Sequence, residues 1–424
     1  MNSFLNMIDR VKERIITTLR WSEGWTKTDM VYVASSFSWV TVGNIFSSVA
    51  SFLFIIAFAN LLPPETFGVY KYVLSIVSIL SITTLTGMSN AVTRSIAQGY
   101  EAVVPEVVWV KIRWGLTGSF AGLLMSGYYY LNGNTLLTLS FLMTAILLPF
   151  MDTFAVYDSL LRGRKLFREV SIYGTIKQFI SVGLMVCVLF FSNNIFLILL
   201  SYFSVRILVD MVFLRLISFN LQLNRKKSPD VISYGKHLSF MSIIGTIADQ
   251  VDKIILWHLL GPISLAVYSF SLSPVLRLRS FVTPLAAIAL PKMSKVTEIT
   301  VATKKSLFIK MLKLLVLLLP VTVAYVVLAP HFYDLFFPDY VESVVYSQFF
   351  VLSLLLVPFS LATMFLTSQA KKKSLYLISI INPSIKIILI VTLLPLFGVW
   401  GAIVALLLSK LSSSLVSLFF FSRA

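Results

Sequence analysis

The stretch Leu61-Leu62-Pro63-Pro64-Glu65-Thr66-Phe67-Gly68-Val69-Tyr70 is a short polar turn between two long apolar runs. A related stretch, Leu259-Leu260-Gly261-Pro262-Ile263-Ser264-Leu265-Ala266-Val267-Tyr268, follows at a constant offset of 198 positions (259 against 61). The match continues to Leu74-Ser75 against Leu272-Ser273. Proline and glycine punctuate most turns, but the shared Val-Tyr and Leu-Ser pairs have no role in a turn. The repeat therefore predicts two related halves, each opening with the same helical hairpin.

The composition is that of a membrane protein. Hydrophobic residues make up 58% of the 424 residues and charged residues only 12%, whereas soluble domains carry roughly 25% charge. Apolar runs of about 20 residues, each sufficient to span a bilayer, recur without the alternation of a β-barrel. We expect about twelve membrane-spanning helices, at residues 36–60, 68–90, 112–131, 135–158, 172–192, 194–217, 238–260, 264–290, 307–329, 343–368, 374–395 and 399–421.

The loops between these spans alternate in charge. The turns at Pro63-Pro64-Glu65, Asn132-Gly133-Asn134 and Gly261-Pro262 contain no Lys or Arg. The loops on the other side are basic, with Arg94 and Lys111, Arg162 to Arg168, Arg225 to Lys236, Lys292 to Lys305, and Lys371 to Lys373. By the positive-inside rule, the basic loops and both termini are cytoplasmic. The same rule accounts for the net charge of +17, so nucleic-acid binding is not expected.

The same pattern divides the chain. Residues 1–35 are expected to form a cytoplasmic arm, with an amphipathic helix on the membrane surface or against a partner. The first half is expected at 36–217, a basic cytoplasmic linker at 218–237, the second half at 238–421 and a short cytoplasmic tail at 422–424. Two halves of six spans each are parallel repeats, and transporters of that design bind substrate near mid-membrane between the halves.

Charged residues inside spans are costly and are functional candidates by default. The candidates are Asp152, Lys177, Arg206, Asp210, Asp249, Asp252, Lys253, Arg277, Arg279, Lys386 and Lys410. Cations outnumber anions among them, which suits a cavity for a phosphate or an acidic sugar. The alternative is that some only mark helix ends or neutralise each other, as Arg206 and Asp210 could at a spacing of four residues.

The seventh span is the most densely charged. Asp249 and Arg277 both lie about 18 Å from the Gly261-Pro262 turn along neighbouring helices, which predicts an Asp249–Arg277 ion pair. Arg277 and Arg279 are about 200° apart around a helix, so they are expected to point in different directions.

Several classes of protein are excluded by missing motifs. The chain has no phosphate loop for ATP and no clustered Cys/His pattern for a metal, and no cofactor is expected. Its single cysteine, Cys187, provides no disulfide.

Twelve spans in two halves and the repeated hairpin resemble the multidrug/oligosaccharidyl-lipid/polysaccharide (MOP) exporter superfamily. Within it, Phe58 to Tyr70, together with Asp252-Lys253, Leu259 to Pro262 and Val267-Tyr268, is similar to the Wzx-type O-antigen and polysaccharide flippases. The resemblance implies a non-enzymatic transporter in the bacterial inner membrane. Its implied substrate is an undecaprenyl-pyrophosphate-linked oligosaccharide, moved by alternating access and driven by protons or another ion, with polysaccharide polymerase machinery as a further partner.

Residue roles follow from the same resemblance. Arg277, Arg279, Arg206 and Lys386 would contact the pyrophosphate or acidic sugars, and Asp249, Asp252 and Lys253 would form ion pairs or couple transport to an ion. The alternatives are a multidrug or cation antiporter of the same superfamily, which should have an acidic or aromatic cavity, and a membrane polymerase or ligase, which should carry a large outer loop. A non-transporting assembly protein is a further alternative.

Overall fold

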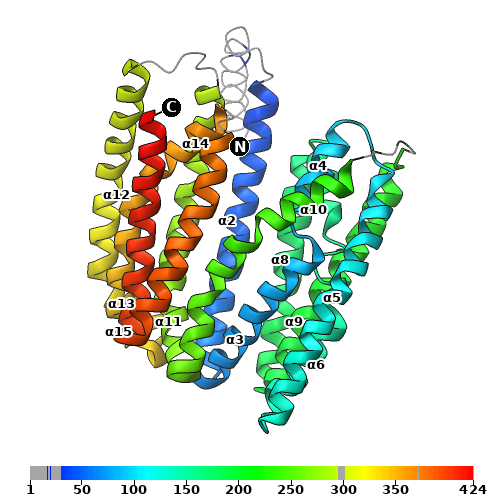
Figure 1. Ribbon diagram of the computed structural model, residues 1–424, viewed down its shortest axis with the longest axis vertical. Helices are drawn as coiled ribbons and strands as arrows, with labels where there is room; N and C mark the ends of the chain where they lie inside the picture. The colour runs from blue at the N-terminus through cyan, green and yellow to red at the C-terminus, as the bar shows by residue number, and fades with distance from the viewer. Residues whose placement is uncertain are drawn as a thin grey trace, which may run out of the picture.

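The structure is a computed structural model of the chain (Figure 1). It describes Thr17, Arg20 and residues 30–224, 226, 228, 230–294, 301–369 and 372–423. Most of the expected amphipathic arm at 1–35 lies outside the described residues, as do Arg225, Lys227, Lys295 and Lys371. The regular elements of the described part are all helical.

The α-helices follow the same order along the chain as the expected spans. They are α2 (Met30–Leu61), α3 (Pro64–Leu80), α4 (Met88–Ala97), α5 (Val103–Leu131), α6 (Thr135–Leu147), α7 (Val156–Gly163), α8 (Phe167–Phe191), α9 (Ile195–Leu221), α10 (Val231–Met241), α11 (Ile243–Ser294), α12 (Val301–Phe336), α13 (Ser343–Phe350), α14 (Ser360–Ser368) and α15 (Lys372–Arg423). Short 3₁₀ segments are η1 (Ser81–Thr84), η2 (Leu148–Phe150), η3 (Pro338–Tyr340) and η4 (Val351–Phe359).

The described helices make twelve crossings. Eight helical segments are long and apolar enough to cross a membrane, and two of these are 50 and 51 residues long. The two long segments each contain a glycine with positive φ, Gly261 and Gly398, where the chain reverses and makes a second crossing. The α5 helix and the α6–η2–α7 series add the last two. The expected all-α fold of about twelve spans is confirmed.

The crossings form two groups that meet at one end (Figure 1). We call the end at which α15 finishes the terminal end, and the end with the Pro63 and Gly261 turns the hairpin end. The two groups diverge from the hairpin end toward the terminal end, with α2 between them (Figure 1). Whether the terminal end is cytoplasmic stays a prediction.

The two copies of the repeated hairpin pack against each other at the hairpin end. Gly68 on α3 lies so close to Pro262 that a Cβ at Gly68 would be 2.8 Å from the Pro262 Cα. The Tyr72 ring stacks on Trp257 with centroids 4.4 Å apart, and one buried apolar cluster contains residues from both halves. Burial of these large rings favours closure at this end.

Helix α10 covers the end of the expected linker and the start of the expected second half, but it packs on the first half. Gly235 faces Met88 on α4, and Gly87 donates its backbone N–H to Ser239 Oγ at 3.1 Å. Val231 joins the buried cluster of the first half, next to Met88. The expected seventh span is therefore broken near Ser242, between α10 on the first half and α11, which packs with α3 and α15.

Candidate functional site

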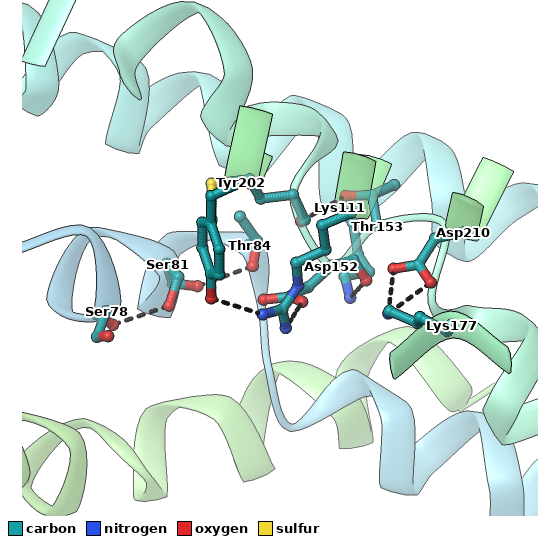
Figure 2. Close-up of polar contacts among 11 residues, drawn as sticks. Ser78, Ser81, Thr84, Lys111, Asp152, Thr153, Lys177, Tyr202 and Asp210 are labelled. Carbon is teal, nitrogen blue, oxygen red and sulfur yellow. Dashed lines mark hydrogen bonds and ion pairs between the residues drawn. The ribbon is translucent and has the colours of Figure 1, made fainter. Parts of the chain in front are cut away.

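A polar network lies inside the first half, where the fourth crossing is broken (Figure 2). Asp152 follows η2 and has a left-handed backbone, with φ 55°. Arg206 on α9 donates from Nη2 to Asp152 Oδ1 at 2.5 Å, and Tyr202 Oη accepts from the same guanidinium at 3.3 Å. Lys111 on α5 donates to the Asp152 carbonyl at 2.8 Å. A helix break leaves carbonyls without helical partners, and here Lys111 satisfies one of them.

A second ion pair lies beside the first. Lys177 Nζ on α8 is 2.5 Å from Asp210 Oδ1 and 2.7 Å from Oδ2 (Figure 2). The alternative that Arg206 and Asp210 neutralise each other is wrong, because each carboxylate is bound by a cation from another helix. The carboxylate of Asp210 is nearly inaccessible, whereas the Arg206 side chain is 36% exposed. Of these residues, Arg206 is thus the accessible cation.

In the second half, Asp249 pairs with Lys386. Lys386 Nζ on α15 lies 2.9 Å from Asp249 Oδ1 on α11. The expected Asp249–Arg277 pair is therefore wrong. The prediction compared depth along two consecutive helices, whereas the pairing depends on which way each side chain points, and α15 presents its lysine to α11. The Asp249 side chain is 73% exposed, so it remains accessible.

Asp252 and Lys253 are bound mostly within their own hairpin. Tyr268 of the repeated Val-Tyr pair donates its hydroxyl to Asp252 Oδ2 at 2.5 Å. Lys253 Nζ lies 3.7 Å from Asp252 Oδ1 and donates to the Asp249 carbonyl at 2.8 Å. Asp252 is almost fully buried, so its carboxylate holds the two helices of the second hairpin together.

The two arginines of α11 line different cavities, as their spacing predicts. Arg277 lines a cavity of about 440 Å³ between α2, α11 and α12, whose walls are otherwise nearly all apolar and include Phe52, Leu278 and Phe332. Arg279 lines a more polar cavity of about 230 Å³ within the second half, together with Lys410. The two arginines of the second hairpin thus belong to two separate cavities.

Sequence reasoning missed two cations. Lys71 on α3 lies close enough to Lys253 and Arg277 for their charges to interact, and Lys111 is buried although it was assigned to a basic loop. Lys71 follows directly after the Val-Tyr pair of the repeat, where the second copy has Ser269. This difference between the two copies could have identified Lys71 as a candidate from the sequence. Lys111 lies eight residues inside α5, about 12 Å along the helix.

The charged groups at mid-span are predominantly cationic. The four anions are Asp152, Asp210, Asp249 and Asp252. The cations are more numerous: Lys71, Lys111, Lys177, Arg206, Lys253, Arg277, Arg279, Lys386 and Lys410. Buried or half-buried cations in such excess attract anions, and guanidinium groups match phosphate geometry. The arrangement can therefore bind an anionic group between membrane helices.

Residues 33–297 match the family model described as "Polysaccharide biosynthesis protein". The chain belongs to the polysaccharide biosynthesis protein family. No curated protein matches the chain significantly.

Solved structures of MOP superfamily transporters share the fold of this polysaccharide biosynthesis protein. One is an outward-facing multidrug resistance MATE family transporter, with 12% identity, a TM-score of 0.61, and coverage of 92% of this chain and 94% of the other. Another is a MOP superfamily transporter from Pyrococcus furiosus Vc1 (DSM3638), described as having a binding pocket of reverse polarity, with 12% identity, a TM-score of 0.58, and coverage of 92% and 95%. A MATE in complex with MaD5 matches with 12% identity, a TM-score of 0.60 and the same coverage. The fold of this family member is thus that of a membrane transporter.

Proposed function

We propose that the protein is a flippase for undecaprenyl-pyrophosphate-linked O-antigen or related polysaccharide repeat units. It would move them from the cytoplasmic to the periplasmic leaflet of the bacterial inner membrane by alternating access, coupled to an ion. The observation that carries the proposal is Arg277, a cation among the lining residues of a large cavity whose surface is nearly all apolar. Such a cavity suits a ligand that joins a hydrocarbon chain to a strong anion.

The two parts of that ligand match the two parts of the cavity. Phe52, Leu278 and Phe332 offer apolar surface to a polyprenyl chain, and burial of each methylene from water contributes about 0.8 kcal/mol. Arg277, with Lys71 nearby, would hold the pyrophosphate through charge-assisted hydrogen bonds. The oligosaccharide would then extend between the two halves, toward Arg206 and Lys386.

Closure at the hairpin end defines the direction of entry. The halves are sealed there by Gly68 against Pro262 and by Tyr72 on Trp257, so substrate would enter from the terminal end. If the basic loops lie in the cytoplasm, as the positive-inside rule predicts, this arrangement would correspond to the inward-facing state of the proposed cycle. Release would require the hairpin contacts to separate.

The test measures the amount and the leaflet of lipid-linked oligosaccharide in a strain that lacks the protein. We expect it to accumulate in the cytoplasmic leaflet and surface glycan to be lost, with both restored by the wild-type chain. The loss of a charged hydrogen bond at Arg277→Ala should weaken substrate binding by about 1.5–3 kcal/mol, about 10- to 150-fold. The matched control is Lys313→Ala, an exposed cation of α12 that does not line the Arg277 cavity.

Two outcomes would overturn the proposal. Unchanged surface glycan with altered drug resistance would instead identify a multidrug antiporter. Normal export by Arg277→Ala at wild-type protein levels would remove Arg277 from the substrate site.

A further inference from the structure

The smaller cavity, of about 230 Å³, lies entirely within the second half. It is bounded by α11, η4, α14 and α15. The two charged side chains of its lining, Arg279 and Lys410, are both cations. Its remaining polar lining consists of hydroxyl groups and the amide of Asn382. The cavity shares no lining residue with the one that Arg277 lines.

Two like charges in one cavity between membrane helices repel each other and lose hydration. Lys410 lies close enough to Arg279 and Lys386 for their charges to interact. None of the ion pairs found among the described residues includes Lys410. The Nζ of Lys410 lies 6.0 Å from the ring centroid of Phe350, and Asp249 is close enough for its charge to interact with that of Lys410. The carboxylate of Asp249 is bound to Lys386.

The neutral groups of the cavity can donate hydrogen bonds. Thr363 Oγ1 donates to Ser417 Oγ at 2.8 Å, which leaves the Ser417 proton available. Asn382 has a buried side-chain oxygen without a hydrogen-bond partner in the described structure. Because the oxygen and nitrogen of an amide exchange by a flip, Asn382, which lines the cavity, can place N–H groups where this oxygen has no donor.

We propose that this cavity binds a small inorganic anion, of chloride to phosphate size, between Lys410, Arg279, Asn382 and Ser417. The anion offsets the repulsion of the two cations and accepts hydrogen bonds from Lys410, Asn382 and Ser417. It also ties α14 to α15, since Thr363 and Ser417 already connect these two helices. The site is separate from the proposed substrate site and concerns the second half alone.

The test is the melting temperature of the purified full-length protein at constant ionic strength. Sodium gluconate is replaced in one series by chloride, in a second by phosphate and in a third by inorganic diphosphate. A ligand that binds only the folded state raises stability with its concentration. We expect chloride or phosphate to raise the melting temperature of the wild type by at least about 2 °C, with a saturating dependence on concentration.

The decisive variant is Lys410→Met, which removes the charge and keeps a long apolar side chain. It should melt at least as high as the wild type in gluconate, because a buried charge is gone, and should lose the response to the anion. Lys313→Met, an exposed cation of the same charge, should keep the full response.

An equal response in Lys410→Met and the wild type would overturn the proposal. So would a wild type that does not distinguish chloride or phosphate from gluconate. A response to inorganic diphosphate alone would assign the cavity to the substrate and would overturn the small-anion site as well. None of these readouts involves transport, so a failure here leaves the flippase proposal to its own test.

Discussion

Replacing Gly68 with leucine should open the hairpin end. Gly68 on α3 faces the backbone of Pro262, and a Cβ there would lie 2.5 Å from the Pro262 carbonyl carbon, whereas ordinary contact begins at 3.4 Å. Even a methyl group therefore requires the two backbones to separate by at least about 0.9 Å, and a leucine requires more. Backbone atoms at a turn cannot rotate away as a flexible side chain can.

The cost follows from overpacking. A side chain forced into a filled contact destabilises it by about 1–3 kcal/mol. Here the penalty applies to the state in which the halves touch and is relieved in a state in which they separate. It should therefore shift the population toward an open hairpin end by about 5- to 150-fold.

The assay is a pair of spin labels, one on each half at the hairpin end. Glu65 and Leu396 are both exposed and serve as labelling positions after the exposed Cys187 is replaced by serine. We expect Gly68→Leu to move the distance distribution to longer values.

The control is Gly127→Leu on α5. This glycine has no atom within 4 Å of an added Cβ, so the same substitution should leave the distribution unchanged. A Gly68→Leu protein that is folded and has the wild-type distribution would refute the reasoning, since it would show that the hairpin contact does not hold the halves together.

Two further predictions concern ion pairs. Lys386→Ala should reduce export of the lipid-linked substrate but change the free energy of unfolding by less than about 1 kcal/mol, because the partner Asp249 is 73% exposed and such pairs are weak. Export is measured as surface glycan and stability as the melting temperature. A large loss of stability with normal export would contradict this prediction. Arg164 donates hydrogen bonds of 2.6 and 2.7 Å to Glu101 at the terminal end and holds the pKa of this carboxyl below its usual value. The stability that this pair provides is therefore complete above the ordinary pKa of about 4.3. It is lost as the pH falls through the lowered pKa. Glu101→Gln should therefore lower stability by about 1–2 kcal/mol at pH 7, and its melting temperature should approach that of the wild type below about pH 4; a constant difference from pH 7 to pH 3 would argue against the pair.

The sequence predicts the crossings well because span length and loop charge are local properties. The turns at Pro64 and Gly261 are where they were expected, since proline and a positive-φ glycine fix the backbone there. The breaks at Leu85 and Asp152 were missed. Both residues have positive φ without being glycine, so their conformation depends on tertiary contacts such as that of Lys111 with the Asp152 carbonyl.

For the ion pairs, too, local features could be predicted and tertiary contacts could not. The charged residues inside the spans could be identified from hydropathy alone, and the spacing of Arg277 and Arg279 gave their different directions. Partner choice could not be identified, because it depends on helices distant in the sequence. Lys386 lies 137 positions from Asp249, and no periodicity connects them.

Contact between Gly68 and Pro262 joins the two copies of the repeated hairpin, and this affects how the two halves can diverge. In most duplicated proteins each copy of a motif lies in its own surroundings, so each can accumulate substitutions separately. Here each copy forms part of the surroundings of the other. The repeat places Ala266 where the first copy has Gly68, and both positions are buried. A larger residue at position 68 has to be accommodated by the second copy, so a change in the first hairpin constrains the sequence of the second.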